Sequence, residues 1–161
     1  LPITFYKSMQ QLPDYEDYSM KGRTYRFMTE TPLYPFGYGL SYTRFSYGKA
    51  TLNQPKLNKG EKAILTIPVS NVGQRDGEEV VQVYICRPDD KEGPQKTLRG
   101  FQRVSIAKGK TQNVQIELPY DSFEWFDAAT NTIRPLNGTY KILYGNSSNE
   151  KDLQTCSIQI Q

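Results

Sequence analysis

The chain has 161 residues, with 20 basic and 17 acidic side chains and a net charge of +3. This near balance argues against nucleic-acid binding, and no apolar run of about 18 residues is present to span a membrane. Histidine is absent, so the commonest general base and metal ligand are missing. No GxSxG, P-loop or GxGxxG motif occurs, so we expect no metal and no cofactor.

The chain opens with the apolar run LPITFY, which predicts a buried strand. No signal peptide precedes this run. We therefore interpret residues 1–7 as the last strand of a preceding domain, and expect the chain to be a C-terminal piece of a longer polypeptide.

Residues 8–45 show neither helical nor strand periodicity, yet with residues 1–7 they hold eleven of the twenty aromatic residues. Disordered linkers are poor in aromatic residues, and a structureless stretch this long is unusual inside one domain. We predict an ordered, extended segment that lies along a surface and is held there by its rings.

From residue 46 onward, alternating apolar positions and turn residues predict about seven strands and no helix. The inward-facing positions are expected to be Ala63, Leu65, Ile67, Val69, Val81, Val83, Ile85, Val114, Ile116, Leu118, Tyr140, Ile142, Tyr144, Cys156, Ile158 and Ile160. The pair Asn137-Gly138 is a strong turn signal. We therefore predict an all-β, antiparallel two-sheet sandwich over residues 46–161.

Three single residues refine this prediction. Pro68 lacks a donor, which suits an edge strand or a bulge. Tyr140 stands near the start of the penultimate strand, where it could form a tyrosine corner. The Cys…Trp…Cys pattern of immunoglobulin domains is missing, which favours a fibronectin type III-like sandwich. Cys86 and Cys156 are interpreted as small buried side chains, since a disulfide would require neighbouring strands.

No set of residues meets the requirements of catalysis. General acid/base chemistry on a glycosidic bond needs two carboxylates that face each other across it. The acidic residues of PDYEDY (residues 13–18) and those around SFEWF (residues 122–126) are better explained as solvated or structural groups. The sequons at Asn137 and Asn146 have meaning only in a eukaryotic secretory protein.

One aromatic group is a candidate for carbohydrate contact, since ring faces stack on the CH faces of sugars. Its members are Tyr120, Trp125 and Phe126, next to Phe123. The alternative is that these rings fill the sandwich or dock it to a neighbour.

Several segments together resemble the C-terminal region of glycoside hydrolase family 3, which includes β-glucosidases and β-xylosidases. The first are GRTYRF (residues 22–27) and PLYPFGYGLSYTRF (residues 32–45). VSNVGQRDGEEVVQVYI, KTLRGFQRVSIAKGKTQNVQIEL and NGTYKILYGNSS then resemble, in order, the fibronectin type III-like domain of that family. The resemblance covers nearly the whole chain.

The resemblance implies a division of the chain and a role. Residues 1–7 would end the preceding α/β sandwich domain, residues 8–45 would be a linker, and residues 46–161 the fibronectin type III-like sandwich. The catalytic nucleophile and acid/base of such enzymes lie upstream, so the resemblance implies no catalytic residue here, and a parent that hydrolyses terminal β-linked sugars with retention. The sequences RTYRF and TLRGFQRV favour the β-xylosidase-like branch of the family.

We expect a non-catalytic accessory domain that stabilises or docks to the catalytic domains of the same polypeptide, in the periplasm or outside the cell. Gly37 and Gly39 would permit close backbone approach at the junction. The docking candidates are Arg23, Tyr25, Arg26, Tyr34, Phe36, Tyr38 and Tyr42. Two alternatives stay open: a polysaccharide-binding module that uses Trp125, Tyr120 or Phe126, and self-association through the aromatic linker.

Overall fold

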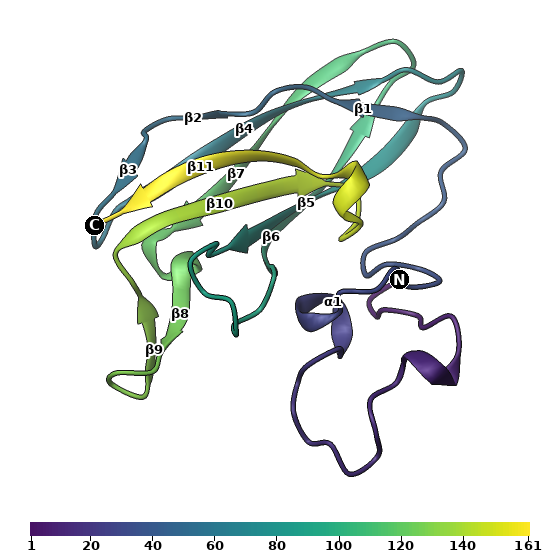
Figure 1. Cartoon of the computed structure of the whole chain (residues 1–161). Coiled ribbons are helices and arrows are strands. Elements are labelled where there is room, and N and C mark those ends of the chain that lie inside the picture. Colours follow the sequence, from purple (N-terminus) through teal and green to yellow (C-terminus); the bar gives the residue numbers. More distant parts are fainter.

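The computed structural model describes all 161 residues and contains a β-sandwich with an irregular N-terminal segment beside one end (Figure 1). Residues 1–44 contain no extended strand, only the 3₁₀ turn η1 (Met9–Gln11), the single helical turn α1 (Thr24–Phe27) and an isolated bridge between Phe5 and Tyr34. The sequence did not indicate either turn, because three or four residues are too few to display a period. No helix is long and apolar enough to cross a membrane.

The first sheet is built around β4 (Lys62–Asn71). On one side β4 pairs with β7 (Thr111–Pro119), and on the other with β1 (Phe45–Tyr47) and β2 (Thr51–Leu52), all antiparallel.

The second sheet has five strands in the order β3-β11-β10-β5-β6. They are β3 (Lys56–Leu57), β11 (Gln154–Ile160), β10 (Gly138–Gly145), β5 (Gly77–Cys86) and β6 (Thr97–Ile106). The pairings are antiparallel except that of β3 with β11, which is parallel.

A separate two-stranded hairpin, β8 (Glu124–Asp127) with β9 (Thr132–Pro135), extends from the sandwich beyond the 3₁₀ turn η2 (Tyr120–Phe123). A third 3₁₀ turn, η3 (Glu150–Asp152), precedes β11. The all-β prediction is confirmed, but the structure has eleven strands instead of about seven. The additional strands have two to four residues, so they are too short for alternation to be visible in the sequence.

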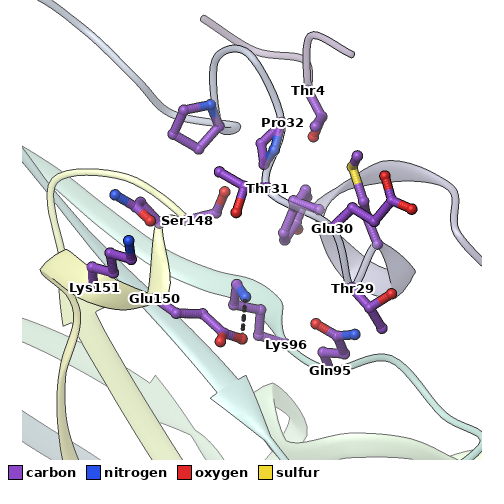
Figure 2. Close-up of a pocket in the computed structure, with 14 residues that line it drawn as sticks. Thr4, Thr29, Glu30, Thr31, Pro32, Gln95, Lys96, Ser148, Glu150 and Lys151 are labelled. Atoms are coloured by element: carbon purple, nitrogen blue, oxygen red, sulfur yellow. Dashed lines mark hydrogen bonds and ion pairs between the residues drawn. The ribbon is translucent and has the colours of Figure 1, made fainter. Parts of the chain in front are cut away.

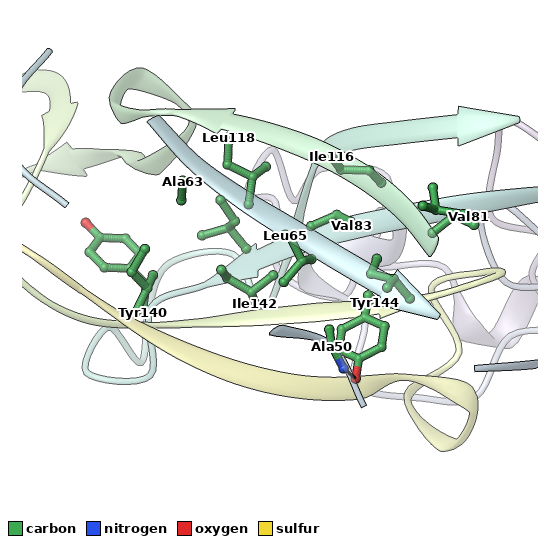
Figure 3. Packing of buried hydrophobic residues seen from close by; sticks show 14 of the residues in the cluster. Ala50, Ala63, Leu65, Val81, Val83, Ile116, Leu118, Tyr140, Ile142 and Tyr144 are labelled. Atoms are coloured by element: carbon green, nitrogen blue, oxygen red, sulfur yellow. Dashed lines mark hydrogen bonds between the residues drawn. The ribbon is translucent and has the colours of Figure 1, made fainter. Parts of the chain in front are cut away.

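The core lies between the two sheets and contains the side chains that the alternation predicts. Figure 3 shows Leu65 of β4 and Leu118 of β7 facing Val83 and Ile142 of the opposite sheet. The predicted positions are buried with one exception, Cys156, which is only partly buried and packs against the core. The hydrophobic effect on these alternating positions therefore determines which face of each long strand points inward.

Pro68 does not lie in an edge strand, because β4 has partners on both sides. Opposite Pro68, the chain passes between β1 and β2, and Gly48 N donates to Pro68 O at 2.8 Å. The missing proline donor therefore falls at an interruption of the ladder, which corresponds to the bulge-like alternative.

Tyr140 has the geometry of a tyrosine corner: its hydroxyl accepts a hydrogen bond from Leu136 N at 3.2 Å, four residues upstream. The cysteines are free, and β10 lies between the strands of Cys86 and Cys156. Burial raises the pKa of both thiols, that of Cys156 to about 11.

Candidate domain-docking site

The outer face of β5 is covered where the N-terminal segment crosses it. A strand at the surface of a sandwich normally buries alternate residues, and the first half of β5 does so. From Val81 to Ile85 every residue is buried, including Gln82 and Tyr84, whose side chains point away from the core. The covering groups come from residues 25–37 and from the loop after β10.

Aromatic stacking fixes the N-terminal segment to the sheet. The rings of Tyr25 and Phe36 are stacked with centroids 4.3 Å apart, and Tyr25 meets the ring of Tyr84 edge-on at 5.8 Å. The hydroxyl of Tyr25 also accepts a hydrogen bond from Leu98 N at 3.1 Å. Burial, and secondarily the neighbouring Tyr25, raises the pKa of Tyr84 well above its ordinary value.

Gln82 links three parts of the chain through one side-chain amide. Its Nε2 donates to the carbonyls of Gly37 at 3.2 Å and Asn146 at 2.5 Å, and its Oε1 accepts from the Tyr84 hydroxyl at 2.6 Å. Ser148 N completes the contact by donating to Phe36 O at 2.8 Å. These bonds satisfy groups that the packing removes from water.

Gly37 is required at this contact for two reasons. Its φ of +81° lies in the left-handed region, and a Cβ there would fall 2.0 Å from Oε1 of Gln82. The expectation of close backbone approach thus holds at Gly37. At Gly39 no atom of this chain lies within 4 Å of a Cβ position.

The first residues of the chain, from Leu1 to Phe5, pair with residues 33–38 of the N-terminal segment. Leu1 donates its terminal amine to Tyr38 O at 2.7 Å, and Gly37 N donates to Leu1 O at 2.8 Å. Phe5 forms the isolated bridge with Tyr34, and their rings meet edge-on with centroids 6.1 Å apart. Residues 1–5 and 33–38 therefore form one layer over the end of the sandwich.

A polar pocket of about 430 Å³ lies where this layer meets the sandwich (Figure 2). Thr31 and Pro32 border one side, while Lys96 and Glu150 border the other. The Lys96 side chain is buried, and its ammonium pairs with Oε1 of the exposed Glu150 at 3.1 Å.

The structure places the predicted docking residues in three different ways. Tyr25 and Phe36 pack on the sandwich of their own chain, and Arg26 offers its carbonyl to Gln95 N at 2.6 Å. Tyr34 and Tyr38 lie beside each other with centroids 5.2 Å apart. Tyr42 is almost fully exposed.

Arg23 orders the loop that precedes it. Its Nε donates to Ser19 O at 3.0 Å, and its Nη2 donates to Asp17 O at 2.5 Å. Asp17 Oδ1 accepts from Ser19 N at 2.8 Å, and hydrogen bonding with Ser19 lowers the pKa of Asp17. The acidic residues of this loop thus make local turn contacts, in the manner typical of Asp side chains.

The carbohydrate-contact candidates are placed differently from one another. Trp125 is only 3% exposed and its Nε1 donates to Asp90 Oδ2 at 2.6 Å, so its ring offers no open face for a sugar. The structure therefore contradicts Trp125 as a carbohydrate-contact residue and agrees with the alternative, that its ring fills the sandwich. Tyr120 is half-buried and its hydroxyl donates to Gln161 O at 3.3 Å, while Phe126 is 55% exposed.

Asp127, another acidic side chain near Trp125, makes its hydrogen bonds within the β8–β9 hairpin. Asp127 accepts from Nε and Nη2 of Arg134 at 3.0 and 2.5 Å, and these bonds are the main reason why its pKa is lowered. No group of three or more His, Cys, Asp or Glu residues is arranged to hold a metal ion.

Sequence reasoning missed Gln82 and Tyr84, which lie on the covered face of β5, and Lys96, which borders the pocket. One signal was available: VQVYI places a glutamine and a tyrosine between apolar residues in a run that is buried throughout. A strand with this pattern needs cover on both faces.

Residues 79–148, from β5 through the loop after β10, match the family model of the fibronectin type III-like domain. The sandwich has a fibronectin type III-like fold. The match extends over the strand that carries Gln82 and Tyr84, so the docking site is built on the outer face of this domain.

Relatives extend the resemblance beyond the fibronectin type III-like domain. A xylan 1,4-β-xylosidase of Xylanibacter ruminicola is 50% identical over 99% of this chain and 18% of its own length. A periplasmic β-glucosidase of Salmonella typhimurium is 32% identical over 79% of this chain and 18% of its own length. The structure of a β-glucosidase from Erythrobacter marinus superposes with a TM-score of 0.79 and 34% identity, over 98% of this chain and 21% of that one. The resemblance to family 3 glycoside hydrolases is confirmed, and the chain spans about a fifth of the length of these relatives.

Proposed function

We propose that this chain is a non-catalytic accessory unit of a family 3 glycoside hydrolase, which docks to the catalytic domains of the same polypeptide and stabilises them. The parent would hydrolyse terminal β-linked sugars with retention, through a pair of carboxylates outside this chain. The names of the relatives, β-xylosidase and β-glucosidase, support this class of parent.

The proposal rests on one observation: some aromatic residues of the N-terminal segment pack on the chain's own sandwich, and others remain exposed. Tyr25 and Phe36 are used to attach the segment to its own sandwich. Tyr15, Tyr18 and Tyr42 remain 92%, 91% and 94% exposed. Large exposed apolar surface of this kind is typical of an interaction site, and the relatives have about four fifths of their length outside the matched part.

The first residues of the chain also present exposed apolar side chains that could belong to this interaction surface. Leu1, Pro2, Ile3 and Phe5 are exposed, and over residues 3–6 exposed Ile3 and Phe5 alternate with partly covered Thr4 and Tyr6. This period of two is that of a strand with its apolar face open. We infer that residues 1–7 end a strand of the preceding domain, that residues 8–45 form the linker, and that residues 46–161 form the sandwich.

The compartment is part of the proposal. We place the parent in the periplasm or outside the cell, with support from the relative named as periplasmic.

Hydrogen–deuterium exchange would test the docking surface. The isolated 161-residue chain is compared with the longer glycosidase that contains it. Peptides around residues 15–18 and 40–42 should exchange more slowly in the longer protein, because the catalytic domains would cover them. Peptides around Ile133, exposed on the hairpin, should exchange equally in both.

Substitutions provide the matched control. Tyr42→Ser should lower the thermal midpoint of activity in the longer enzyme by several degrees, about 1 kcal/mol of lost contact, and leave the isolated chain unchanged. Ile133→Ser should affect neither. Equal exchange of the tyrosine peptides in both proteins would exclude this docking surface.

A further inference from the structure

Three short loops lie side by side at the end of the sandwich that is opposite to the hairpin β8–β9. The loops are residues 41–44 before β1, residues 72–76 between β4 and β5, and residues 107–110 between β6 and β7. Strand register brings them together, because Phe45 pairs with Asn71, and Gly77 pairs with Ile106. We call the surface formed by these three loops the basic end.

A buried asparagine fixes the three loops to one another. Asn71 is 1% exposed, and its Nδ2 donates to Arg75 O at 2.8 Å and to Ile106 O at 2.9 Å. Its Oδ1 accepts from Thr43 Oγ1 at 2.7 Å. The backbone N of Asn71 donates to Lys110 O at 2.9 Å. The basic end is therefore already formed, and a partner would meet it without the entropic cost of ordering it.

The basic end carries the excess charge of the chain. Its loops contain four basic side chains and one acidic side chain, namely Arg44, Arg75, Lys108, Lys110 and Asp76. This difference equals the net charge of the whole chain, +3, so basic and acidic residues balance elsewhere. The four basic residues are exposed and none of them forms an ion pair. The carboxylate of Asp76 accepts from Lys108 N at 2.7 Å, so it is used by the loop itself.

Two apolar side chains accompany these charges. Tyr42 is 94% exposed and Val72 is 52% exposed. Their loops are joined, since Val72 N donates to Arg44 O at 2.8 Å. Tyrosine and arginine are both enriched at protein–protein interfaces relative to the rest of the surface. The composition of the basic end is therefore that of an interface with a protein.

The preceding part of the polypeptide would reach this chain close to the basic end. Leu1 N donates to Tyr38 O at 2.7 Å. The few residues from Tyr38 to Tyr42 span at most about 14 Å. In Figure 1 the N-terminus and the start of β1 lie on the same side of the sandwich. Because the two parts would be covalently joined, even a weak contact between them has a high effective concentration.

We propose that the basic end docks onto an acidic surface of the domain that precedes this chain in the same polypeptide. This inference rests on the proposed function and adds the chemistry of the partner surface, which is a group of carboxylates facing Arg44, Arg75, Lys108 and Lys110. Tyr42 would pack inside the contact. A second copy of the chain fits less well, since a two-fold contact brings the same patch, and here the same cations, together.

Labelling of lysine side chains tests the contact directly. The isolated chain and the longer glycosidase that contains it are treated with an amine-reactive acetylating reagent, and each site is followed by mass spectrometry. Lys108 and Lys110 should react about two- to fivefold more slowly in the longer protein, as expected for ammonium groups in exposed ion pairs. Raising NaCl from 0.1 to 1 M shortens the screening length from about 10 to about 3 Å and should reduce this difference. Lys59, an exposed lysine at the opposite end of the sandwich, should react equally in both proteins.

Charge reversal provides the second measurement. The double variant Lys108→Glu/Lys110→Glu should lower the thermal midpoint of the longer enzyme by about 2–4 °C. It should not destabilise the isolated chain, because these side chains form no ion pair there. Lys56→Glu/Lys59→Glu changes the net charge equally at the other end of the sandwich and should leave both midpoints unchanged.

The outcomes separate this inference from the docking proposal. Slower hydrogen exchange at residues 15–18 in the longer protein, with equal labelling of Lys108 and Lys110 in both proteins, would keep the docking proposal and overturn this one. Protection that appears only at high concentration of the isolated chain, or only on vesicles of anionic lipid, would assign the basic end to a second copy or to a membrane, and would also overturn it. Equal effects of the two double variants would exclude a role specific to the basic end.

Discussion

The hydroxyl of Tyr84 donates to Oε1 of Gln82 at 2.6 Å, on the face of β5 that points away from the core. Both residues are buried although they belong to an outer face. The bond orients the glutamine so that its Nε2 faces the carbonyls of Gly37 and Asn146. This side-chain pair thus acts together with the stacked rings of Tyr25 and Phe36 to hold the N-terminal segment on the sandwich.

Gln82→Leu should lower the free energy of unfolding by about 2–3 kcal/mol, since it leaves a buried hydroxyl and two carbonyls without partners. Chemical denaturation measures the change, and limited proteolysis near residues 34–40 should speed up. Gln102→Leu, at an exposed position of β6, is the control and should change stability by less than about 0.5 kcal/mol. Similar losses in both variants would contradict the assigned role of Gln82.

Gly37→Ala should destabilise the chain by about 2 kcal/mol, from the positive φ and the clash of the new Cβ with Gln82. Gly39→Ala has open space around the Cβ position and should have little effect. Thermal unfolding of the two variants side by side measures this difference. A tolerated Gly37→Ala would show that the segment does not contact β5 as described.

Tyr144→Phe should cost more stability than Tyr140→Phe. The hydroxyl of Tyr144 accepts from Ala50 N at 2.8 Å and also contacts Gln154 Oε1 at 2.9 Å, whereas that of Tyr140 accepts one bond, from Leu136 N. At about 1 kcal/mol for each buried bond, the expected losses are about 2 and 1 kcal/mol in denaturant unfolding. Tyr42→Phe, on an exposed ring, should be neutral, and the reverse order would refute this account of the two buried hydroxyls.

Asp90 should contribute to acid unfolding. Partial burial acts to raise its pKa, but the hydrogen bonds from Trp125, Gly93 and Glu92 outweigh this and leave the pKa below its ordinary value. A carboxylate with a lowered folded-state pKa stabilises the fold above its unfolded pKa, about 4, and loses this contribution as pH falls through the folded value.

Asp90→Asn should therefore flatten the stability profile below about pH 4 and lower stability near neutral pH. The measurement is denaturant unfolding from pH 2 to 7, with Trp125 fluorescence as the probe. Asp121→Asn, at an exposed position, is the control. An unchanged acid limb in Asp90→Asn would show that the loop does not depend on this carboxylate.

Much of the sandwich was predictable because alternation is a local property. The inward positions of β4, β5, β7 and β10 follow from apolar residues two apart, and the structure confirms them. The Asn137-Gly138 turn and the corner at Tyr140 depend on residues close in sequence. The strands β1, β2 and β3 were missed because their few residues pair only with strands distant in sequence.

The sequence by itself determined a two-sheet sandwich with a separate, aromatic-rich N-terminal segment, because side-chain hydrophobicity and turn chemistry act within a few residues. Only the tertiary structure decided which rings are used inside the chain and which remain open. Tyr25 and Trp125 are covered by segments about sixty and thirty-five residues away, at Tyr84 and Asp90, while Tyr42 and Phe126 are exposed. Burial depends on what the rest of the chain brings to a side chain, and no local pattern records that.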